Sequence, residues 1–186
     1  MAAEKMSPVP TRTYASASRT GWWRRGVQLP RGLRLLVIEG YRPHALQERY
    51  FASSMTRIAR ANPDWPTERV HTEAATYVSP PSVAPHVAGG AVDLTVCAVD
   101  GAELPMGTEV NATPPECDTA CFTASGLIDA RSRANRQTLI DAMTATGFVN
   151  YPSEWWHWSY GDRYWTFVTG PTHARYGPAT LNPAQL

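Results

Sequence analysis

Residues 86–96, HVAGGAVDLTV, contain the turn and the strand on which the predicted fold depends. Apolar and polar residues alternate from 91 to 96, which predicts a β-strand. The Gly89-Gly90 pair before it allows a tight turn. Asp93 lies inside this strand, where Asp is unusual, and a buried carboxylate is costly unless it is paired or bound to a metal. The turn could therefore bring His86 and Asp93 together, although a solvent-facing Asp93 is the simpler alternative.

Other segments have the patterns of strands and helices. Apolar runs predict further strands at 33–38, 148–150, 155–160 and 164–169, with Gly161-Asp162 as the hairpin turn between the last two. Helical spacing of apolar residues predicts helices at 43–60, 66–77 and 130–146, the first two beginning at a proline. Prolines make 79–85 an extended loop, and 101–127 is expected to be irregular. This order predicts one α+β domain, with a mainly antiparallel sheet and helices packed on it.

Charge and composition exclude several classes of protein. The chain has 186 residues, with 17 Lys and Arg against 16 Asp and Glu, and its net charge of +1 provides no basic footprint for nucleic acid or a membrane. It contains no run of 18 apolar residues, and residues 1–26 have no apolar signal-peptide region, so we expect a cytoplasmic protein. No feature of the sequence indicates an oligomeric state.

The 3 cysteines exclude a full disulfide framework because their number is odd. Cys117 and Cys121 could pair across a short loop and leave Cys97 alone, but free thiols are the simpler interpretation for a cytosolic protein. A metal site built on Cys117 and Cys121 is not expected, because no second pair is present to complete four ligands.

A second group of polar residues lies in the most aromatic part of the chain, Glu154-Trp155-Trp156-His157. Glu154 and His157 are three residues apart, so a straight strand would place them on opposite faces. They can reach one site only if the segment bends or makes a helical turn. The alternative is that Glu154 lies at a rim and His157 packs among the tryptophans. We expect Trp155, Trp156 and Trp158 to wall a dry cleft, in which electrostatic interactions are stronger.

Taken together, His86, Asp93 and His157 supply two imidazoles and one carboxylate. This is a ligand set of a catalytic zinc ion, which keeps its fourth position open for water. Glu154 would then be the unligated general base beside that water. The chain contains no HExxH sequence, which excludes the thermolysin type of zinc protease.

Arg42 is the candidate for stabilising the negative charge that develops on the substrate during hydrolysis. It lies in Glu39-Gly40-Tyr41-Arg42-Pro43, at the junction between a predicted strand and a predicted helix, and Pro43 stiffens this junction. The alternative for Arg42 is a structural salt bridge, for instance with Glu39.

These residues resemble the D-alanyl-D-alanine dipeptidase family, which shares one fold with the zinc DD-carboxypeptidases and the hedgehog signalling domain. The resemblance covers about residues 33–170 and rests on four motifs in the same order, Gly40-Tyr41-Arg42-Pro43, His86-x-x-Gly-x-Ala-x-Asp93-Leu94-Thr95, Pro105-Met106-Gly107 and Glu154-Trp-Trp-His157. It implies that one zinc ion is bound by His86, Asp93 and His157. It also implies that Glu154 is the catalytic base, that Arg42 stabilises the transition state, and that the cleft admits only small dipeptides.

The chain departs from the family pattern in four places. Ala84 stands where Ser is frequent, polar residues are usual where Val87 and Ala88 stand, and the segment before residue 33 aligns poorly. Asn111 falls where the dipeptidases usually carry an Asp that holds the amino terminus of the substrate. The predicted substrate-binding residues are Asn111, Tyr41, Trp155 and Trp156. The predicted organisation is an N-terminal arm at 1–32, a zinc dipeptidase-like catalytic domain at 33–170 and a C-terminal tail at 171–186.

Three functions are compatible with this pattern. The first is zinc-dependent hydrolysis of a small dipeptide, D-Ala-D-Ala or a close relative, in peptidoglycan metabolism. The second keeps the zinc site but acts on another small peptide or amide, such as a cell-wall stem peptide or a secondary metabolite. The third is a zinc-containing binding domain without catalysis, and the presence of both Glu154 and Arg42 argues against it because a structural zinc needs neither.

Overall fold

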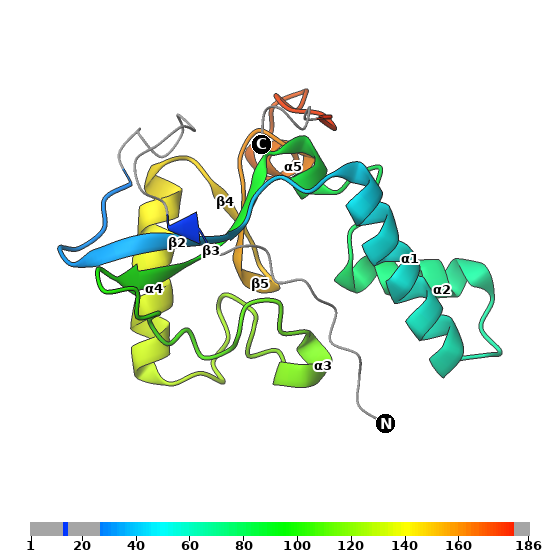
Figure 1. The fold of residues 1–186 in the computed structure, drawn as a ribbon, viewed down its shortest axis with the longest axis horizontal. Coiled ribbons are helices and arrows are strands. Elements are labelled where there is room, and N and C mark those ends of the chain that lie inside the picture. The colour runs from blue at the N-terminus through cyan, green and yellow to red at the C-terminus, as the bar shows by residue number, and fades with distance from the viewer. Residues whose placement is uncertain (1–12, 15–26, 181–186) are drawn as a thin grey trace.

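The computed structural model describes residues 13–14 and 27–180, and in these residues five strands form one sheet. The strand order is β1-β2-β3-β5-β4, and each pair of neighbours is antiparallel. The strands are β1 (Thr13–Tyr14), β2 (Leu33–Glu39), β3 (Ala91–Ala98), β4 (Val149–Tyr151) and β5 (Glu154–Ser159). With the helices that pack beside this sheet (Figure 1), the prediction of an α+β domain with an antiparallel sheet is confirmed.

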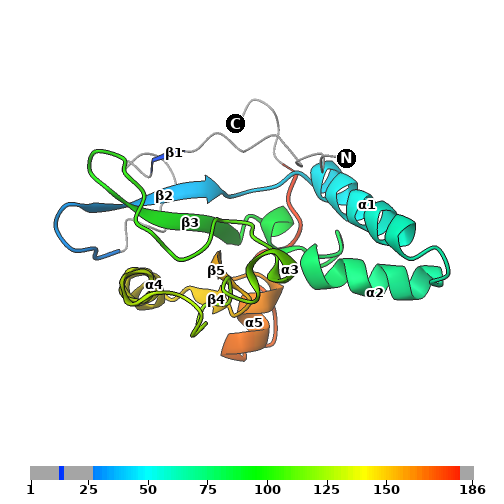
Figure 2. The ribbon, with the colours of Figure 1, turned by 90° about the horizontal axis from the view of Figure 1, so that it is seen from below.

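The helices occupy two regions of the molecule. Their bounds are α1 (His44–Ala61), α2 (Thr67–Tyr77), α3 (Pro114–Cys117), α4 (Ala130–Ala145) and α5 (Arg163–Thr169), with a short 3₁₀ helix, η2, at Pro85–Ala88. Figure 2 shows α4 beneath the sheet and the α1–α2 hairpin projecting from one end of it. The main core lies between the sheet and α4, whereas the hairpin has a small core of its own, made of Phe51, Ile58, Val70 and Ala74.

The central strand, β3, is buried along both of its faces. Every residue from Ala91 to Cys97 is buried, so the alternation of residue types in this segment does not correspond to a wet and a dry face. Leu94 and Val96 belong to the main core, and Cys97 packs in a second cluster with Leu36. Asp93 is only 3% exposed, and the solvent-facing alternative for this carboxylate is therefore wrong.

The predicted helices and strands agree with the structure except at the C-terminal end. The segment 164–169 was expected to be a strand, but it belongs to helix α5. Asp162 caps this helix by accepting a hydrogen bond of 2.8 Å from the backbone N–H of Trp165, so Gly161-Asp162 is not a hairpin turn. The aromatic run looked like a strand because its apolar residues are nearly continuous, yet Phe167 is 85% exposed and Trp165 is buried, as on two sides of a helix.

Smaller differences concern the prolines. Pro43 and Pro66 each stand directly before a helix, in extended conformations, and not at its first position. The expected loop at 79–85 leads into the unpredicted helix η2, which begins at Pro85. The irregular stretch contains one short helix, α3. Cys117 and Cys121 are free thiols.

Candidate metal centre

The structure brings together three of the predicted site residues, His86, Asp93 and His157. Asp93 in β3 is directly opposite His157 in β5, because the two strands pair in that register. His86 lies in η2, and Gly89 reverses the chain towards β3 with a φ of +65°, which favours glycine. A side chain at the next residue, Gly90, would put its Cβ 2.8 Å from the Cβ of Asp162, so this close approach also needs glycine.

The polar atoms of this cluster are close enough to share one ion. The His157 Nδ1 atom lies 2.9 Å from Asp93 Oδ1 and 3.2 Å from His86 Nε2, and His86 Nε2 lies 3.4 Å from Asp93 Oδ2. One ligand atom from each residue fits within a group no wider than 4.8 Å. All three side chains are buried, with between 3% and 6% of each residue exposed. The cluster therefore has the composition and the compactness of a mononuclear metal site.

A backbone contact fixes the proton of His86. Its Nδ1 atom lies 2.7 Å from the carbonyl oxygen of Gly40, which can only accept a hydrogen bond. Nδ1 therefore carries a proton, and Nε2 is the ring atom that faces Asp93 and His157. A hydrogen bond from the far ring nitrogen to a backbone carbonyl is typical of histidines that bind metals.

Interactions within the cluster shift the pKa values of Asp93 and His157 even without a metal. Burial alone would raise the pKa of Asp93, but the charge of His86 and hydrogen bonds from His157 and His86 lower it well below its usual range. Burial alone would lower the pKa of His157, but its hydrogen bond and charge interaction with Asp93 raise it above its usual value. Asp93 is therefore an anion, and it holds a proton on His157 that a metal would have to displace.

Glu154 reaches the same site through an irregularity in the sheet. Tyr151 of β4 pairs with Glu154, but its neighbour Asn150 pairs with Trp158, so three residues of β5 bulge between the two pairs. The bulge breaks the alternation of side chains, and Glu154 Oε2 lies 3.9 Å from His157 Nδ1. About a third of the Glu154 side chain remains exposed, at 32%. Burial raises its pKa, and the charge of His157 opposes that shift.

Arg42 makes the salt bridge with Glu39 that the sequence left open, and among the described residues it also keeps donors free. Its Nε and Nη2 atoms donate to the two carboxylate oxygens of Glu39 at 2.7 and 2.5 Å, and Nη1 donates to Gln47 Oε1 at 2.7 Å. A guanidinium has five N–H groups, so one remains on each Nη after these contacts. The backbone N–H of Arg42 donates to the carbonyl of His86 at 3.1 Å, which ties this junction to the metal cluster.

The predicted substrate-binding residues lie in different environments. Tyr41 donates its hydroxyl to the carbonyl of Ala179 at 2.7 Å. Trp155 and Trp156 are each 2% exposed and belong to the main core, where their rings meet edge to face. Asn111 is exposed and has a positive φ of 65°. Their roles towards a substrate stay predictions.

Sequence reasoning missed three residues that support or border this site. Gln47 is fully buried and bridges Arg42 to the carbonyl of Ser79, to which its Nε2 donates at 2.7 Å. Tyr151 stands beside the cluster, with its ring 5.9 Å from that of His157. Asn150 lies at the bulge described above. A signal existed for two of them, because Asn is unusual in a strand and a Gln on the buried side of a helix needs a polar partner.

The irregular stretch is attached to the core by Arg136 of α4. This buried guanidinium donates to the carbonyls of Met106, Phe122 and Ala120 at 2.7, 2.7 and 2.8 Å. Burial lowers the pKa of Arg136 to about 10. The cation therefore holds together a loop that has little regular structure, and it does so next to β5, with Trp155 under its charged group.

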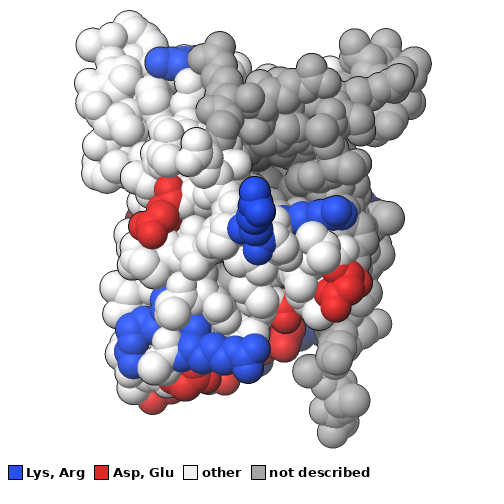
Figure 3. Space-filling model, turned by 90° about the vertical axis from the view of Figure 1, so that its left-hand side faces the viewer, with Lys and Arg blue, Asp and Glu red and all other residues white. Residues whose placement is uncertain are grey.

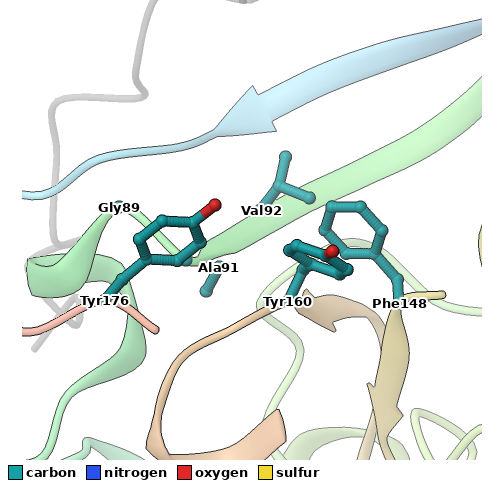
Figure 4. Close-up of a pocket in the computed structure, with 7 residues that line it drawn as sticks. Gly89, Ala91, Val92, Phe148, Tyr160 and Tyr176 are labelled. Carbon is teal, nitrogen blue, oxygen red and sulfur yellow. The ribbon is translucent and has the colours of Figure 1, made fainter. Parts of the chain in front are cut away.

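Two surface features are distinct from the cluster. A small cavity of about 90 Å³ (Figure 4) is lined by Gly89, Gly90, Ala91, Val92, Phe148, Tyr160 and Tyr176, and by none of the three cluster residues. Among the described residues on the face shown in Figure 3, acidic and basic side chains are interspersed with uncharged ones. Within the described part of the chain, no helix has the length and apolarity needed to cross a bilayer.

A compact His-Asp-His cluster with a nearby carboxylate has the donor set that fits a catalytic metal ion. The family model described as D-ala-D-ala dipeptidase, of peptidase family M15, matches residues 25–174. The chain therefore belongs to the D-Ala-D-Ala dipeptidase family, a family of metallopeptidases, and the resemblance stated above is confirmed.

Individual relatives are similar at moderate identity. The chain is 30% identical over 146 residues to a D-alanyl-D-alanine dipeptidase of Enterococcus faecalis, and the match covers 74% of this chain and 69% of that protein. It is 24% identical over 158 residues to a D-alanyl-D-alanine dipeptidase of Synechocystis sp., covering 75% of this chain and 64% of the relative. The chain thus spans about two thirds of the length of these curated relatives.

Solved structures are similar at a lower level. VanYB in complex with D-Ala-D-Ala has a TM-score of 0.40 and 19% identity, over 69% of this chain and 60% of that chain. The D,D-pentapeptidase VanY of a VanB-type resistance cassette, in complex with Zn(II), has a TM-score of 0.41 and 18% identity, over 77% of this chain and 70% of that chain.

Proposed function

We propose that this protein hydrolyses a small dipeptide, D-Ala-D-Ala or a close relative, with one zinc ion per chain and with Glu154 as the general base. The observation that carries the proposal is the placement of Glu154 Oε2 3.9 Å from His157 Nδ1, at the edge of the His86-Asp93-His157 cluster. A structural metal site needs no such carboxylate, and it usually takes its fourth ligand from the protein.

The residues of the cluster fit zinc. Two imidazole nitrogens and one carboxylate oxygen are zinc ligands, and a set of three leaves one tetrahedral position for water. The hydrogen bond of His86 also fits, because Nδ1 donates to the backbone and Nε2 faces the cluster, where its lone pair would bind the metal. Bound zinc would lower the pKa of water to about 7 and polarise the carbonyl of the peptide bond.

The residues of the chain have separate tasks in this proposal. Glu154 accepts a proton from the attacking water and delivers it to the nitrogen of the leaving amine, so the peptide bond breaks as the amine is protonated. Its raised pKa suits this task, because the carboxylate must give the proton back. Arg42 directs its two remaining N–H groups at the oxygen that becomes negative during the attack. Glu39 and Gln47 hold that guanidinium in place.

Metal analysis combined with Glu154→Gln tests this proposal. We expect one zinc per chain in protein prepared without chelator, and we expect Glu154→Gln to keep the zinc while lowering kcat about 10²- to 10⁴-fold. Glu68→Gln, an exposed position on α2, is the matched control and should retain full activity. Absence of metal from both proteins would overturn the proposal. A fourth protein ligand on the zinc, with no hydrolysis of any dipeptide, would instead support the non-catalytic binding domain.

A second candidate keeps this chemistry and changes the substrate. Asn111 is the observation that favours it, because the neutral amide falls where the dipeptidases usually carry an Asp for the amino terminus of the substrate. Rates on L,L-, L,D- and D,D-dipeptides, with free and acetylated amino termini, distinguish the two candidates. If Asn111 faces the amino terminus, Asn111→Asp raises the preference for a free amine about tenfold, the effect of one hydrogen bond to a charged group. Activity confined to D-Ala-D-Ala in the unaltered protein would eliminate this candidate.

A further inference from the structure

The convergence of Glu154 and His157 depends on how β5 is held against β4. One step along β4, from Asn150 to Tyr151, corresponds to four steps along β5, from Trp158 to Glu154. A strand paired one to one would put Glu154 and His157 on opposite faces of the sheet. The bulge is therefore the local structure that places a general base beside a metal ligand, and the contacts that hold it closed decide the geometry of the site.

The side-chain amide of Asn150 bridges the bulge. Its Nδ2 atom donates to the backbone carbonyl of Glu154 at 3.1 Å and to that of His157 at 3.0 Å, with the carbonyl of Trp155 at 3.4 Å. One NH₂ group thus binds the two ends of the segment whose side chains meet at the metal cluster. An amide is suited to this because its two hydrogens lie in one plane and diverge towards two acceptors.

The Asn150 amide is itself oriented by the neighbouring loop. Its Oδ1 atom accepts a short hydrogen bond from the hydroxyl of Thr123. Thr123 is held in turn, because its backbone N–H donates to the carbonyl of Pro152 at 2.9 Å. The backbone N–H of Trp155 donates to the carbonyl of Cys121 at 3.1 Å. The loop at 121–123 and Asn150 therefore hold the bulge from two sides.

We propose that Asn150 is a positioning residue: its amide, oriented by Thr123, holds the β5 bulge so that Glu154 and His157 face one site. This rests on the proposed function for its catalytic consequence, although the geometric part does not need it. Asn150 touches neither substrate nor metal in this proposal. When the amide is lost, β5 can relax towards one-to-one pairing, and Glu154 then moves away from His157.

Asn150→Ala is the primary test, with Asn135→Ala as the matched control. Asn135 also donates its amide to a backbone carbonyl, that of Pro105 at 2.8 Å, but it lies on α4 outside the bulge. We expect Asn150→Ala to weaken zinc binding, measured by competition with a chelator, about tenfold or more, as loss of a hydrogen bond that orients a metal ligand does. We expect kcat to fall by a similar factor with KM changed less than twofold, while Asn135→Ala changes neither quantity.

A second pair of variants separates positioning from folding. Thr123→Val removes the hydroxyl that orients Asn150 and keeps the shape of the side chain, whereas Thr123→Ser keeps the hydroxyl. Thr123→Val should lower zinc affinity and kcat in the same direction as Asn150→Ala, and Thr123→Ser should restore both. A role in stability alone would lower Tm in all these variants without changing the zinc affinity or kcat of the folded fraction, and that result would overturn the proposal.

A crystal structure of metal-free Asn150→Ala keeps this inference independent of the proposed function. An increase in the distance between Glu154 Oε2 and His157 Nδ1, from 3.9 Å, supports the positioning role even if no dipeptide is hydrolysed. An unchanged bulge with unchanged zinc affinity disproves it. Absence of zinc binding and hydrolysis in the unaltered protein, together with a displaced Glu154 in the variant, disproves the proposed function and leaves this inference standing.

Discussion

The two halves of strand β3 differ in how they are paired. Towards its C-terminal end, β3 pairs with β2 one to one, from Val37 opposite Leu94 to Leu33 opposite Ala98. Around Asp93 the pairing is irregular on both sides. The register with β2 shifts between Val37 and Glu39, and β5, which pairs Asp93 with His157, is itself bulged against β4. The regular half contains core residues, and the irregular half contains the candidate chemistry.

This difference has a physical reason. Regular pairing sends alternate side chains to opposite faces, so a single point on the sheet receives only every second residue of a strand. A bulge lets side chains that would otherwise point to opposite faces converge, as those of Glu154 and His157 do. The same irregular half must bury charged groups, which costs stability. The regular half offsets this cost with apolar residues such as Leu94, which is fully buried.

Asp93→Ala should have the largest effect on turnover. It removes the only carboxylate of the proposed ligand set, so we expect loss of bound zinc and of detectable hydrolysis, with the circular dichroism spectrum of a folded protein. Zinc content by mass spectrometry of the metal and rates on D-Ala-D-Ala measure both effects. Stoichiometric zinc in Asp93→Ala would show that the irregular half is not the metal site.

Arg42→Lys is expected to have the next largest effect. Lysine cannot bind Glu39 and Gln47 with one planar fork and still direct two N–H groups at the substrate. Loss of oxyanion stabilisation of this kind lowers kcat about 10²- to 10³-fold, and zinc content should not change. Arg60→Lys, on the exposed end of α1, is the control for the charge-preserving substitution. Equal rates for Arg42→Lys and the control would show that Arg42 does not stabilise the oxyanion and that its role is the salt bridge to Glu39.

The regular half was also the half that the sequence predicted best. Periodicity and turn residues predict where β2, β3 and the long helices lie, although the alternation in β3 does not separate a wet from a dry face, because every residue from Ala91 to Cys97 is buried. The site required a different argument, since His86, Asp93 and His157 become meaningful only as a set of ligands. The sequence shows that Asn150 is unusual in a strand, but it does not show that the amide bridges a bulge, because a bulge is set by hydrogen bonds between segments. The helix at 163–169 was missed because its apolar run resembles a strand, whereas the cap at Asp162 decides the outcome.

Acidification should weaken zinc binding, because a proton and the metal compete for His157 Nδ1. Burial alone would lower the pKa of His157, but Asp93 raises it above 6.5. Below the raised pKa, the pair of Asp93 and protonated His157 stabilises the metal-free protein, and this contribution is lost as the pH rises through that pKa. Zinc affinity changes in the opposite sense, by about tenfold per pH unit for one displaced proton.

Thermal unfolding, followed with zinc and with chelator at several pH values between about 5 and 8, tests whether the stability of the metal-free protein and the zinc affinity change in opposite directions. The difference in Tm between the two conditions should widen as the pH rises, because the metal-free protein loses stability while zinc binds more tightly. A difference that stays constant across this range would mean that no proton on His157 competes with the metal.

Leu94→Ala should have the smallest effect on turnover, although it lies next to Asp93 in the sequence. Leu94 is fully buried in the main core, so its truncation should cost about 2–5 kcal/mol of unfolding free energy. Its partner in the sheet is Val37, at the last regular pair before the register shift. The folded variant, assayed well below its Tm, should keep zinc affinity and kcat within about twofold, since the ligands depend on the bulged pairings and not on this contact. If kcat falls instead while zinc affinity is unchanged, the regular half positions the catalytic groups as well as stabilising them, and the division of β3 into two halves does not hold.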